Sequence, residues 1–306
     1  MRRKVVVTVW VLILAMTVSL GEIYAETSVI SIAYNSMPFN LPSIVERQQG
    51  FLAQEGYEIQ YNTFLVGHAM TEAMISGDLD IAPVMGATST IVSKAGGRDI
   101  KVIGCYSQAP GGFGLAALPG TLSLNELRGA KIAVPIGTEV HVLLGKILAE
   151  QGLTFKDVNL VNLLVPDGIA ALQSGQVDGT MVVEPVMSKL TQAGKIEVLR
   201  DGQGLIGGLT LSVVPSSLVD SPKVKAFQKA HEQSIAYMAE HYEEVLAMVV
   251  SQMNLPASVV ENVAAKYSFQ SEITEQIRLE LDETIEFLFQ EGIIRKRISV
   301  EELLAY

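Results

Sequence analysis

Cysteine is nearly absent from this chain, since Cys105 is the only one in 306 residues. No disulfide can therefore form within the chain, and the fold has to be stabilised by its core. Cys105 follows Val-Ile-Gly at 102–104 and is predicted to be a packed residue at a strand end, as free cysteines commonly are. Tryptophan is equally rare: only Trp10 is present, close to the N-terminus, so no large aromatic clamp is expected around a ligand.

Positive charge is also scarce. The chain has 22 Lys and Arg against 33 Asp and Glu, for a formal net charge of −11. No basic run is interleaved with aromatic residues, so nothing favours binding to nucleic acid or to an anionic membrane surface. Hydrophobic residues make up 49% and charged residues 18%, a balance typical of globular proteins. The length suffices for two domains of ordinary size.

A long apolar run occurs only at the N-terminus. Residues 2–4 are basic, residues 5–20 are predominantly apolar, and Ile-Tyr-Ala at 23–25 forms a small-residue cleavage site. This pattern predicts a secretory signal peptide, residues 1–25, cleaved near Ala25. The alternative, a retained membrane anchor, is disfavoured because the run is short for a membrane span. No cysteine stands at the cleavage site, so the protein is not expected to be a lipoprotein, and we predict a free periplasmic protein.

Short apolar runs alternate with amphipathic segments through residues 28–193, with 165–168 expected as a loop. This alternation predicts an α/β fold with mostly parallel, doubly wound sheets. Strands are expected at 28–34, 59–64, 79–85, 101–105, 132–134, 158–163 and 177–183. Helices are expected at 42–49, 68–76, 89–95, 139–151, 169–174 and 186–193, followed by C-terminal helices at 222–240, 243–253, 256–267, 271–290 and from 300.

One segment of the chain is repeated. Residues 73–80 (AMISGDLD) match residues 171–178 (ALQSGQVD), with Ala, Ser, Gly and Asp identical. Each copy is typical of a short helix, a glycine stop, a buried hydrophobic residue and an aspartate that enters the next strand. The repeat therefore predicts two lobes of the same design.

The stretch 131–152 is predicted to be a strand, a tight turn and a helix. The strand breaks at Pro135, the chain turns at Gly137, and Thr138 is the expected N-cap. The first turn of such a helix directs unpaired N–H groups beyond the end of the strand, where α/β folds bind small ligands. The alternative is an ordinary βα unit without a ligand.

Three groups of residues together resemble a known family. They are Gly67 … Ser76-Gly77-x-Leu79-Asp80-Ile81 … Gly86-Ala87, Leu127-x-Gly129-x-Lys131-Ile132-Ala133-Val134-Pro135-x-Gly137-Thr138, and Ala171 to Asp178 … Glu184-Pro185. This ordered set resembles the periplasmic solute-binding proteins of ABC importers for nitrate, sulfonates, taurine and thiamine precursors. The resemblance covers about residues 28–230, and the C-terminal helices agree in kind.

The resemblance implies a two-lobe periplasmic-binding-protein fold of type II. Lobe one is expected from 26–118 and 212–306, and lobe two from 119–211. The chain is expected to cross between the lobes near 115–118 and 211–214. Ligand would lie in the cleft between the lobes, and closure about the two crossings would be a hinge motion.

The same resemblance implies that loops at strand ends line the cleft. In lobe one the candidates are Ser36, Met37, Pro38, Phe39, Gly67, His68, Gly86, Ala87 and Thr88. In lobe two they are Gly137, Thr138, Glu139, Pro166, Asp167, Glu184 and Pro185. Thr138 is expected to donate its hydroxyl to a polar or anionic ligand group. Glu184, which ends an apolar strand, is either a ligand contact or a carboxylate at the start of the next helix.

These positions depart from the family in one way: they offer no basic side chain except His68 and His141, both interpreted as more often structural. Bare inorganic anions such as nitrate and bicarbonate are therefore disfavoured. An aminosulfonate, a pyrimidine or another small organic acid is favoured, with a cationic or donor group for Glu184. A ring in such a ligand has four candidate stacking partners: Tyr34, Phe39, Tyr106 and Phe113.

The sequence thus predicts a monomeric solute-binding protein that delivers a small polar or anionic organic solute to an ABC permease with its cytoplasmic ATPase. Neither a cofactor nor a metal is expected. The alternative is an enzyme of the same fold, of the pyrimidine or menaquinone-pathway type. It is disfavoured because the sequence has no metal-ligand spacing, nucleophile elbow or phosphate loop. Two questions stay open: whether the protein is instead a sensor that docks on a receptor, and which ligand it binds.

Overall fold

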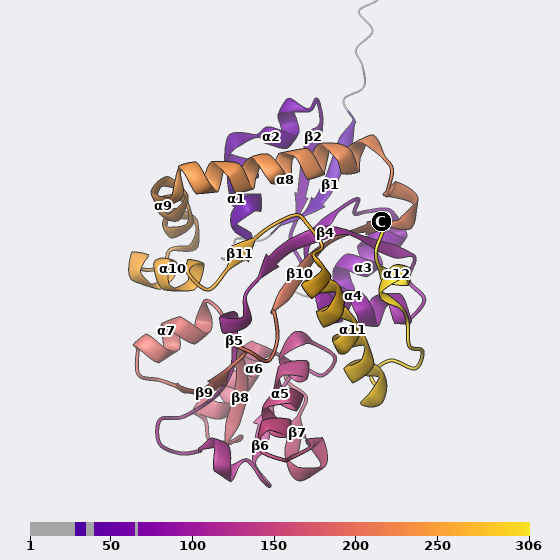
Figure 1. Cartoon of the computed structure of the whole chain (residues 1–306). Helices are drawn as coiled ribbons and strands as arrows, with labels where there is room; N and C mark the ends of the chain where they lie inside the picture. Colours follow the sequence, from indigo (N-terminus) through magenta and orange to yellow (C-terminus); the bar gives the residue numbers. More distant parts are fainter. Residues whose placement is uncertain (1–27, 35–39, 65–66) are drawn as a thin grey trace, which may run out of the picture.

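The computed structural model describes residues 28–34, 40–64 and 67–306. Helices and strands form two lobes, which lie one above the other in Figure 1. The predicted signal peptide and the candidate residues Ser36, Met37, Pro38 and Phe39 lie outside the described residues. In the part of the chain that is described, no helix has the length and hydropathy of a membrane span.

Lobe one contains two small sheets. Strands β1 (Val29–Ala33) and β2 (Glu58–Asn62) pair in parallel. The second sheet has the order β11-β4-β10-β3, and its strands are β3 (Ala82–Gly86), β4 (Ile100–Gln108), β10 (Leu209–Pro215) and β11 (Ser268–Phe269). A parallel bridge between Ile32 and Ile81 links the two sheets.

Lobe two contains one sheet with the order β7-β6-β8-β5-β9. Its strands are β5 (Phe113–Ala117), β6 (Lys131–Ala133), β7 (Asn159–Val161), β8 (Gly179–Val183) and β9 (Glu197–Asp201). Strands β7, β6 and β8 are parallel, whereas β5 is antiparallel to both of its neighbours. The strands β9, β10 and β11 were not among those expected.

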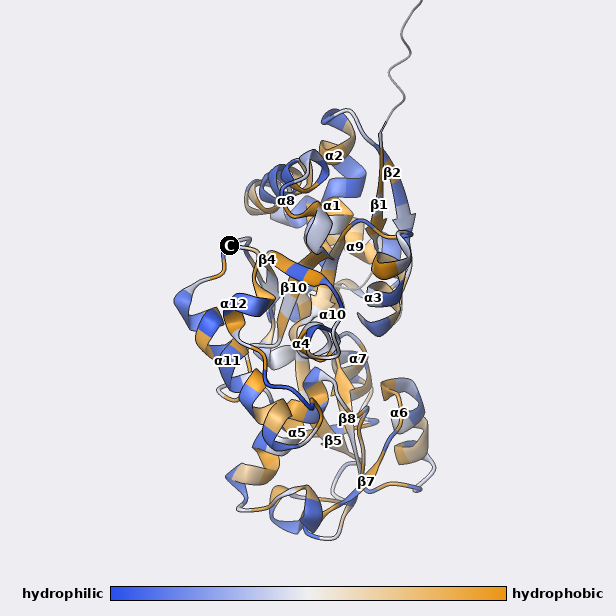
Figure 2. Cartoon of the chain, turned by 90° about the vertical axis from the view of Figure 1, so that its right-hand side faces the viewer, coloured by the Kyte–Doolittle hydropathy of each residue, from blue (hydrophilic) through white to orange (hydrophobic). Residues whose placement is uncertain are grey.

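The helices cover the faces of these sheets. In lobe one they are α1 (Leu41–Gln49), α2 (Phe51–Gln54), α3 (Gly67–Ser76), α4 (Ala87–Ala95), α8 (Pro222–Glu240), α9 (Tyr242–Met253), α10 (Ala257–Ala264), α11 (Glu275–Gln290) and α12 (Val300–Leu303). In lobe two they are α5 (Glu139–Glu150), α6 (Val165–Gln173) and α7 (Val186–Gln192). Along these helices Figure 2 shows both hydrophilic and hydrophobic residues, as expected where one face is buried. The expectation of a loop at 165–168 is wrong, because these residues form the first turn of α6.

The chain crosses between the lobes at 109–112 and 202–208. Strand β5, which the expected division places in lobe one, is hydrogen-bonded within the lobe-two sheet, and β10 belongs to lobe one. The crossings therefore lie several residues before those expected, while the exact lobe boundaries stay a prediction. Because the chain leaves lobe one along β4 and returns along β10, these neighbouring strands are antiparallel. The four-stranded sheet of lobe one is antiparallel in every pairing and the sheet of lobe two is mixed, so among the described strands the expected parallel pairing is found for β1 with β2 and for β7, β6 and β8.

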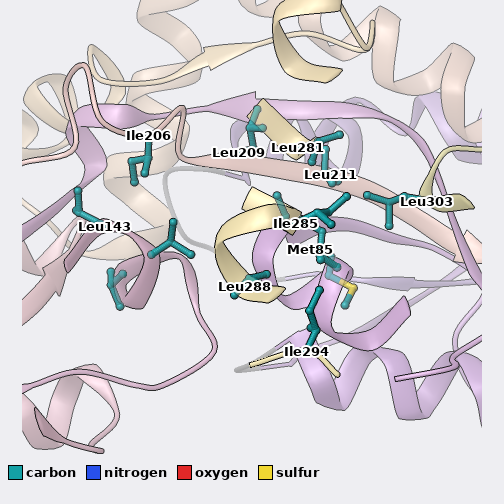
Figure 3. Packing of buried hydrophobic residues seen from close by; sticks show 14 of the residues in the cluster. Met85, Leu143, Ile206, Leu209, Leu211, Leu281, Ile285, Leu288, Ile294 and Leu303 are labelled. Carbon is teal, nitrogen blue, oxygen red and sulfur yellow. The ribbon is translucent and has the colours of Figure 1, made fainter. Parts of the chain in front are cut away.

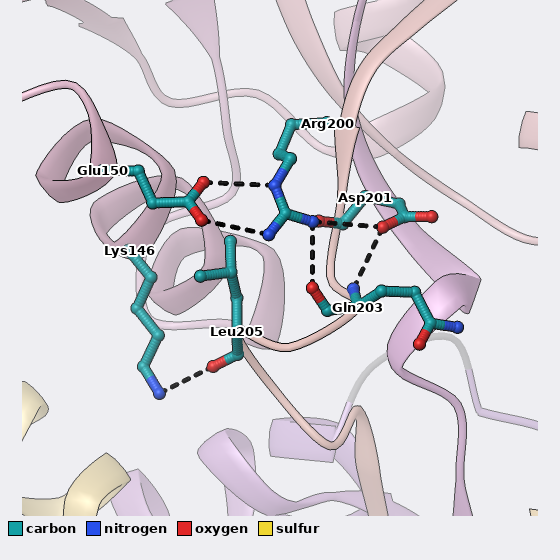
Figure 4. Close-up of polar contacts among 6 residues, drawn as sticks. All are labelled: Lys146, Glu150, Arg200, Asp201, Gln203 and Leu205. Carbon is teal, nitrogen blue, oxygen red and sulfur yellow. Dashed lines mark hydrogen bonds and ion pairs between the residues drawn. The ribbon is translucent and has the colours of Figure 1, made fainter.

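The return crossing is tied to α5 by polar contacts (Figure 4). Arg200 binds both carboxylate oxygens of Glu150, at 3.1 and 3.0 Å, and donates to the backbone oxygen of Gln203 at 2.9 Å. Lys146 Nζ donates to the backbone oxygen of Leu205 at 2.8 Å. Because the backbone oxygens of Gln203 and Leu205 are both hydrogen-bonded to side chains of lobe two, the crossing has few conformations open to it and lies close to lobe two.

The sequence repeat corresponds to one structural device used twice. The carboxylate of Asp80 accepts from the backbone N–H of Ser31 at 2.9 Å, and that of Asp178 accepts from Lys131 N–H at 2.8 Å. In both copies the aspartate N–H also donates to the same partner's carbonyl, at 2.9 and 2.8 Å. Each aspartate thus ties the residues just before its own strand, β3 or β8, to the neighbouring strand β1 or β6, and the predicted repetition of one design is confirmed.

A hydrophobic cluster joins the lobes along α11. Figure 3 shows Leu281 and Leu288 of α11 with Met85 of lobe one and Leu143 of α5. At the far end of α11, Phe287 approaches α5 at Gly145: a Cβ on Gly145 would lie 2.5 Å from its ring. The close approach of the two helices therefore depends on glycine.

We expect Gly145→Ala to lower the free energy of unfolding by about 1 kcal/mol, because the clash outweighs the gain in helix propensity. In a Phe287→Ala background the nearer clash is removed and a contact with Phe155 at 2.9 Å remains, so the same substitution should lower that free energy by less. Urea unfolding of the four proteins of this cycle measures the coupling. Equal effects of Gly145→Ala in both backgrounds would contradict the packing described here.

Candidate functional site

A cavity of about 230 Å³ lies between the two lobes, where strands β3 and β8 end. Both lobes contribute to its walls. It is lined by Phe64, Gly67, Met70, Val84, Gly86, Phe113, Glu139, Val183, Glu184, Gly208, Leu209, Thr210 and Tyr267. We call this cavity the cleft. Another cavity, of about 360 Å³, lies within lobe one beside β4 and α8, away from these strand ends.

Four of the predicted site residues lie in the walls of the cleft: Gly67, Gly86, Glu139 and Glu184. Three helices begin there, since Gly67 is the first residue of α3, Gly86 is the N-cap of α4, and Glu139 is the first residue of α5. Their first turns carry N–H groups without intrahelical partners and the positive ends of the helix dipoles. Whether these residues contact a ligand stays a prediction.

Glu139 links the two lobes. Its Oε2 accepts a 2.5 Å hydrogen bond from the hydroxyl of Thr88, a buried residue of α4. Burial raises the pKa of the Glu139 carboxyl to about 7; Glu280 raises it further, while the bond from Thr88 and the charge of Lys146 oppose the rise. The carboxyl therefore changes its charge near neutral pH, at the boundary between the lobes.

Glu184 is almost fully buried, with 1% of its surface exposed, and its oxygens are used within the protein. The backbone N–H of Ser188 donates to Oε2 at 3.0 Å, and the hydroxyl of Ser188 donates to Oε1 at 2.7 Å. Lys266 forms an ion pair with Oε1. These contacts support the alternative, a carboxylate at the start of α7, here with a cation beside it. Because Glu184 also lines the cleft, its contact with a ligand stays a prediction.

Thr138 occupies the predicted N-cap position, does not line the cleft, and uses its hydroxyl within the chain, so its contact with a ligand stays a prediction. The hydroxyl donates to the backbone oxygen of Pro135 at 2.6 Å, and no side-chain cap bond forms. Gly137 makes the turn with a φ of 79° and does not line the cleft. His141 stacks on Phe155 with ring centroids 4.6 Å apart, and burial lowers its pKa. Its structural role is confirmed.

The other predicted residues that the structure describes do not line the cleft. His68 is exposed on α3, and Pro166 and Asp167 are exposed on the first turn of α6. Ala87, Thr88 and Pro185 are buried behind the cleft walls. The sequence was misleading at 166–167 because Gly168 suggested a helix that begins at 169. The helix α6 begins at Val165, and its first turn places Pro166 and Asp167 on the outside.

Several aromatic and apolar residues of the cleft were missed. Phe39 lies outside the described residues, and of the three described ring-stacking candidates only Phe113 lines the cleft. The hydroxyl of Tyr106 is bonded to Ser43, and that of Tyr34 to Gln252. Thr210 lies opposite Gly86 in the pairing of β10 with β3, so predicting β10 would have placed it there. No local pattern marks Tyr267, which follows a helix of lobe one.

Within the described part of the chain, no group of three or more His, Cys, Asp or Glu is placed to hold a metal ion. The polar side chains of the cleft are Glu139, Glu184, Thr210 and Tyr267, and burial raises the pKa of the Tyr267 hydroxyl well above its usual range. The site can thus donate and accept hydrogen bonds between largely apolar walls. This composition is typical of small-molecule sites.

Comparison with known proteins gives consistent results. A family model described as NMT1/THI5 like matches residues 38–245. A protein of Escherichia coli K12 named for binding aliphatic sulfonates is 27% identical over 207 residues, 66% of this chain and 65% of that protein. The taurine-binding periplasmic protein of the same strain is 28% identical over 170 residues, 56% of this chain and 53% of that protein. The chain thus spans roughly two thirds of the length of the first relative and about half of the length of the second.

Among solved structures, the alkanesulfonate-binding protein of Xanthomonas axonopodis pv. citri, bound to MOPS, superposes with a TM-score of 0.80. The match covers 90% of this chain and 98% of that one, at 23% sequence identity. A likeness at this level of identity shows the fold: the periplasmic-binding-protein fold predicted from the sequence is confirmed.

Substitution of Glu139 by Gln should change how stability depends on pH. Because the pKa of the Glu139 carboxyl is raised, this carboxyl keeps its proton in the folded protein between about pH 4.5 and 7, whereas in the unfolded chain it has lost it. The free energy of unfolding of the wild type therefore falls as pH rises through this window. We expect Glu139→Gln to be more stable than wild type by up to about 3 kcal/mol at pH 8, and by little at pH 4.5.

Urea unfolding at several pH values measures this difference. Glu275→Gln is the matched control, because Glu275 is the first residue of α11 but is exposed. A difference between wild type and Glu139→Gln that does not grow with pH would contradict the described environment of the carboxyl.

Removing Glu184 should affect stability. Glu184→Ala leaves Lys266 and Ser188 without their acceptor, so we expect the free energy of unfolding to fall by about 1 to 3 kcal/mol. In the double variant with Lys266→Met the loss should be smaller than the sum of the single losses. If Glu184→Ala unfolded like wild type while a ligand bound to it more weakly, Glu184 would be a ligand contact after all.

Proposed function

We propose, from the premise that this chain belongs to the NMT1/THI5-like family, that it is an extracytoplasmic solute-binding protein of an ABC importer. The observation that carries the proposal is the cleft between the lobes, to which both lobes contribute residues. A solute held there contacts both lobes at once and so favours their closure about the crossings at 109–112 and 202–208. The closed form is the one delivered to the permease and its cytoplasmic ATPase.

The proposed ligand is a small polar or anionic organic solute of the sulfonate, taurine or pyrimidine type. Two relatives are named for binding aliphatic sulfonates and taurine. The cleft volume of about 230 Å³ suits a small molecule. Three helix N-termini supply N–H donors for a polar or anionic group, and the apolar walls suit a short carbon chain or a ring.

Bare nitrate and bicarbonate suit the cleft less well. No Lys, Arg or His lines it among the residues that the structure describes, so an isolated inorganic anion would have only helix N-termini and a few hydroxyls as partners. Glu139 adds negative charge to the same wall when it is ionised. A solute with a larger neutral or positively charged part offsets that charge.

The remaining features of the proposal concern the state of the protein. We propose export through a signal peptide, residues 1–25, and a free, monomeric periplasmic form without a lipid anchor. A role as an enzyme is not favoured, because the carboxylate of Glu184 is bound to Ser188 and Lys266, and the hydroxyl of Thr210 is hydrogen-bonded to that of Ser107. Light scattering of the exported form tests the monomer.

Ligand screening by thermal shift tests the proposed function. The protein from Glu26 onward is screened against sulfonates, taurine, nitrate, bicarbonate, pyrimidines, aromatic acids and amino acids. A ligand at 100 times its dissociation constant adds about 2.7 kcal/mol to the free energy of unfolding and should raise Tm by a few degrees. Unfolding and refolding beforehand removes any ligand that copurifies, so a refolded protein that no solute stabilises would count against the proposal.

Filling the cleft should abolish the response to that ligand. A Cβ on Gly86 meets no atom within 4 Å, and its φ of −57° suits any residue, so Gly86→Leu should fold and place its side chain in the cleft. We expect its affinity to be at least about 10-fold lower, measured by calorimetry. Ala170→Leu, on the exposed side of α6, is the control. Undiminished binding by Gly86→Leu would place the site elsewhere.

A further inference from the structure

The cleft contains two carboxylates, and only one of them is paired with a cation. Glu184 forms its ion pair with Lys266. Glu139 accepts a hydrogen bond from Thr88 through Oε2, and no described residue donates a hydrogen bond to its Oε1. The two glutamates therefore differ in what they can offer a ligand: Glu184 is already neutralised, whereas Glu139 keeps one acceptor oxygen and its charge.

The charged groups near Glu139 do not supply the missing cation. On α11, Glu280 has the same charge and raises the pKa of Glu139. On α5, Lys146 favours the ionised form, but its Nζ donates to Leu205 O at 2.8 Å and lies 3.7 Å from Glu283. On α4 the partner is the neutral hydroxyl of Thr88. Lys146 is thus occupied on the side away from the cleft, whose lining does not include it.

No basic side chain elsewhere in the cleft compensates the charge. The lining residues that the structure describes include no Lys, Arg or His, and the segments 35–39 (Asn-Ser-Met-Pro-Phe) and 65–66 (Leu-Val) contain none in the sequence. An ionised Glu139 therefore stands in a largely apolar cavity whose described lining supplies no counter-charge. A buried carboxylate in that position is stabilised by any ligand that brings a positive charge to it.

We propose that Glu139 selects solutes that carry a protonated nitrogen, an amine or an amidine, over the same solutes without it. This inference rests on the proposed function and specifies its ligand class. The nitrogen donates to Oε1 of Glu139 and supplies the cation that the cleft lacks. The polar or anionic part of the solute is left to the first turns of α3 and α4, which begin at Gly67 and Gly86 in the same cleft.

Matched pairs of solutes test the inference. Taurine is compared with ethanesulfonate, β-alanine with propionate, and γ-aminobutyrate with butyrate, because the members of each pair differ only in the amine. Dissociation constants are measured by calorimetry at about pH 8, where the Glu139 carboxyl is mostly ionised. For at least one pair we expect wild type to bind the amino member about 10- to 100-fold more tightly, as for a hydrogen bond between charged groups.

Two variants identify the group responsible. Glu139→Gln keeps the shape and can still accept from Thr88, so we expect it to fold and the preference for the amine to fall to about 1- to 3-fold. Thr88→Val removes the hydrogen bond between the lobes but keeps the carboxylate, and it should retain the preference. Loss of the preference in Thr88→Val as well would show that Glu139 acts by holding the lobes together, which would overturn the inference.

The remaining outcomes separate this inference from the proposed function. A wild type that binds ethanesulfonate, nitrate or another solute without an amine at least as tightly as the amino members would still be a binding protein, and Glu139 would not be selective for a cation. A preference for the amine that persists in Glu139→Gln would likewise overturn the role of Glu139. A refolded wild type that binds no solute of the pairs or of the wider panel would contradict the proposed function itself.

Discussion

The constraint on which the rest of the structure depends is that the chain crosses twice between its two main sheets. The crossing strands are interior strands: β10 lies between β4 and β3, and β5 lies between β8 and β9. Because these strands lie in the middle of their sheets, the ends of β3 and β8 and the helices that follow them face each other across one cleft.

Packing along α11 adds to this arrangement. Its apolar residues contact both lobe one and α5, and Gly145 lets the ring of Phe287 approach α5 closely. The lobes are thus connected on one side by a hydrophobic cluster and in the centre by the crossings, and the return crossing is held to α5 by Arg200 and Lys146. The hydrogen bond between Thr88 and Glu139 is a polar contact of the same interface.

Two glutamates in one cleft show how neighbours decide the role of a residue type. Glu184 ends an apolar strand, which suggested a ligand contact, yet Ser188 and Lys266 satisfy its carboxylate. Glu139 was expected at the cleft together with Gly137 and Thr138, and of these three only Glu139 lines it, with an acceptor oxygen to which no described residue donates. Lys266 is distant in sequence from Glu184, so no local pattern could have indicated which carboxylate is neutralised.

Much of the fold was predictable because its signals are local. Alternating apolar runs and glycine stops indicated most strands and helices, and the repeat at 73–80 and 171–178 indicated two lobes, since Asp80 and Asp178 each bond the backbone of a neighbouring strand in the same way. The strands β9, β10 and β11 were missed, as was the lobe to which β5 belongs, because such pairings join segments far apart in the sequence. The sequence by itself determined the α/β class, the two-lobe design and the glycines where helices begin at the cleft. Only the tertiary structure decided which charges meet there, because ion pairs and cavity walls depend on distances between residues that the chain order does not specify.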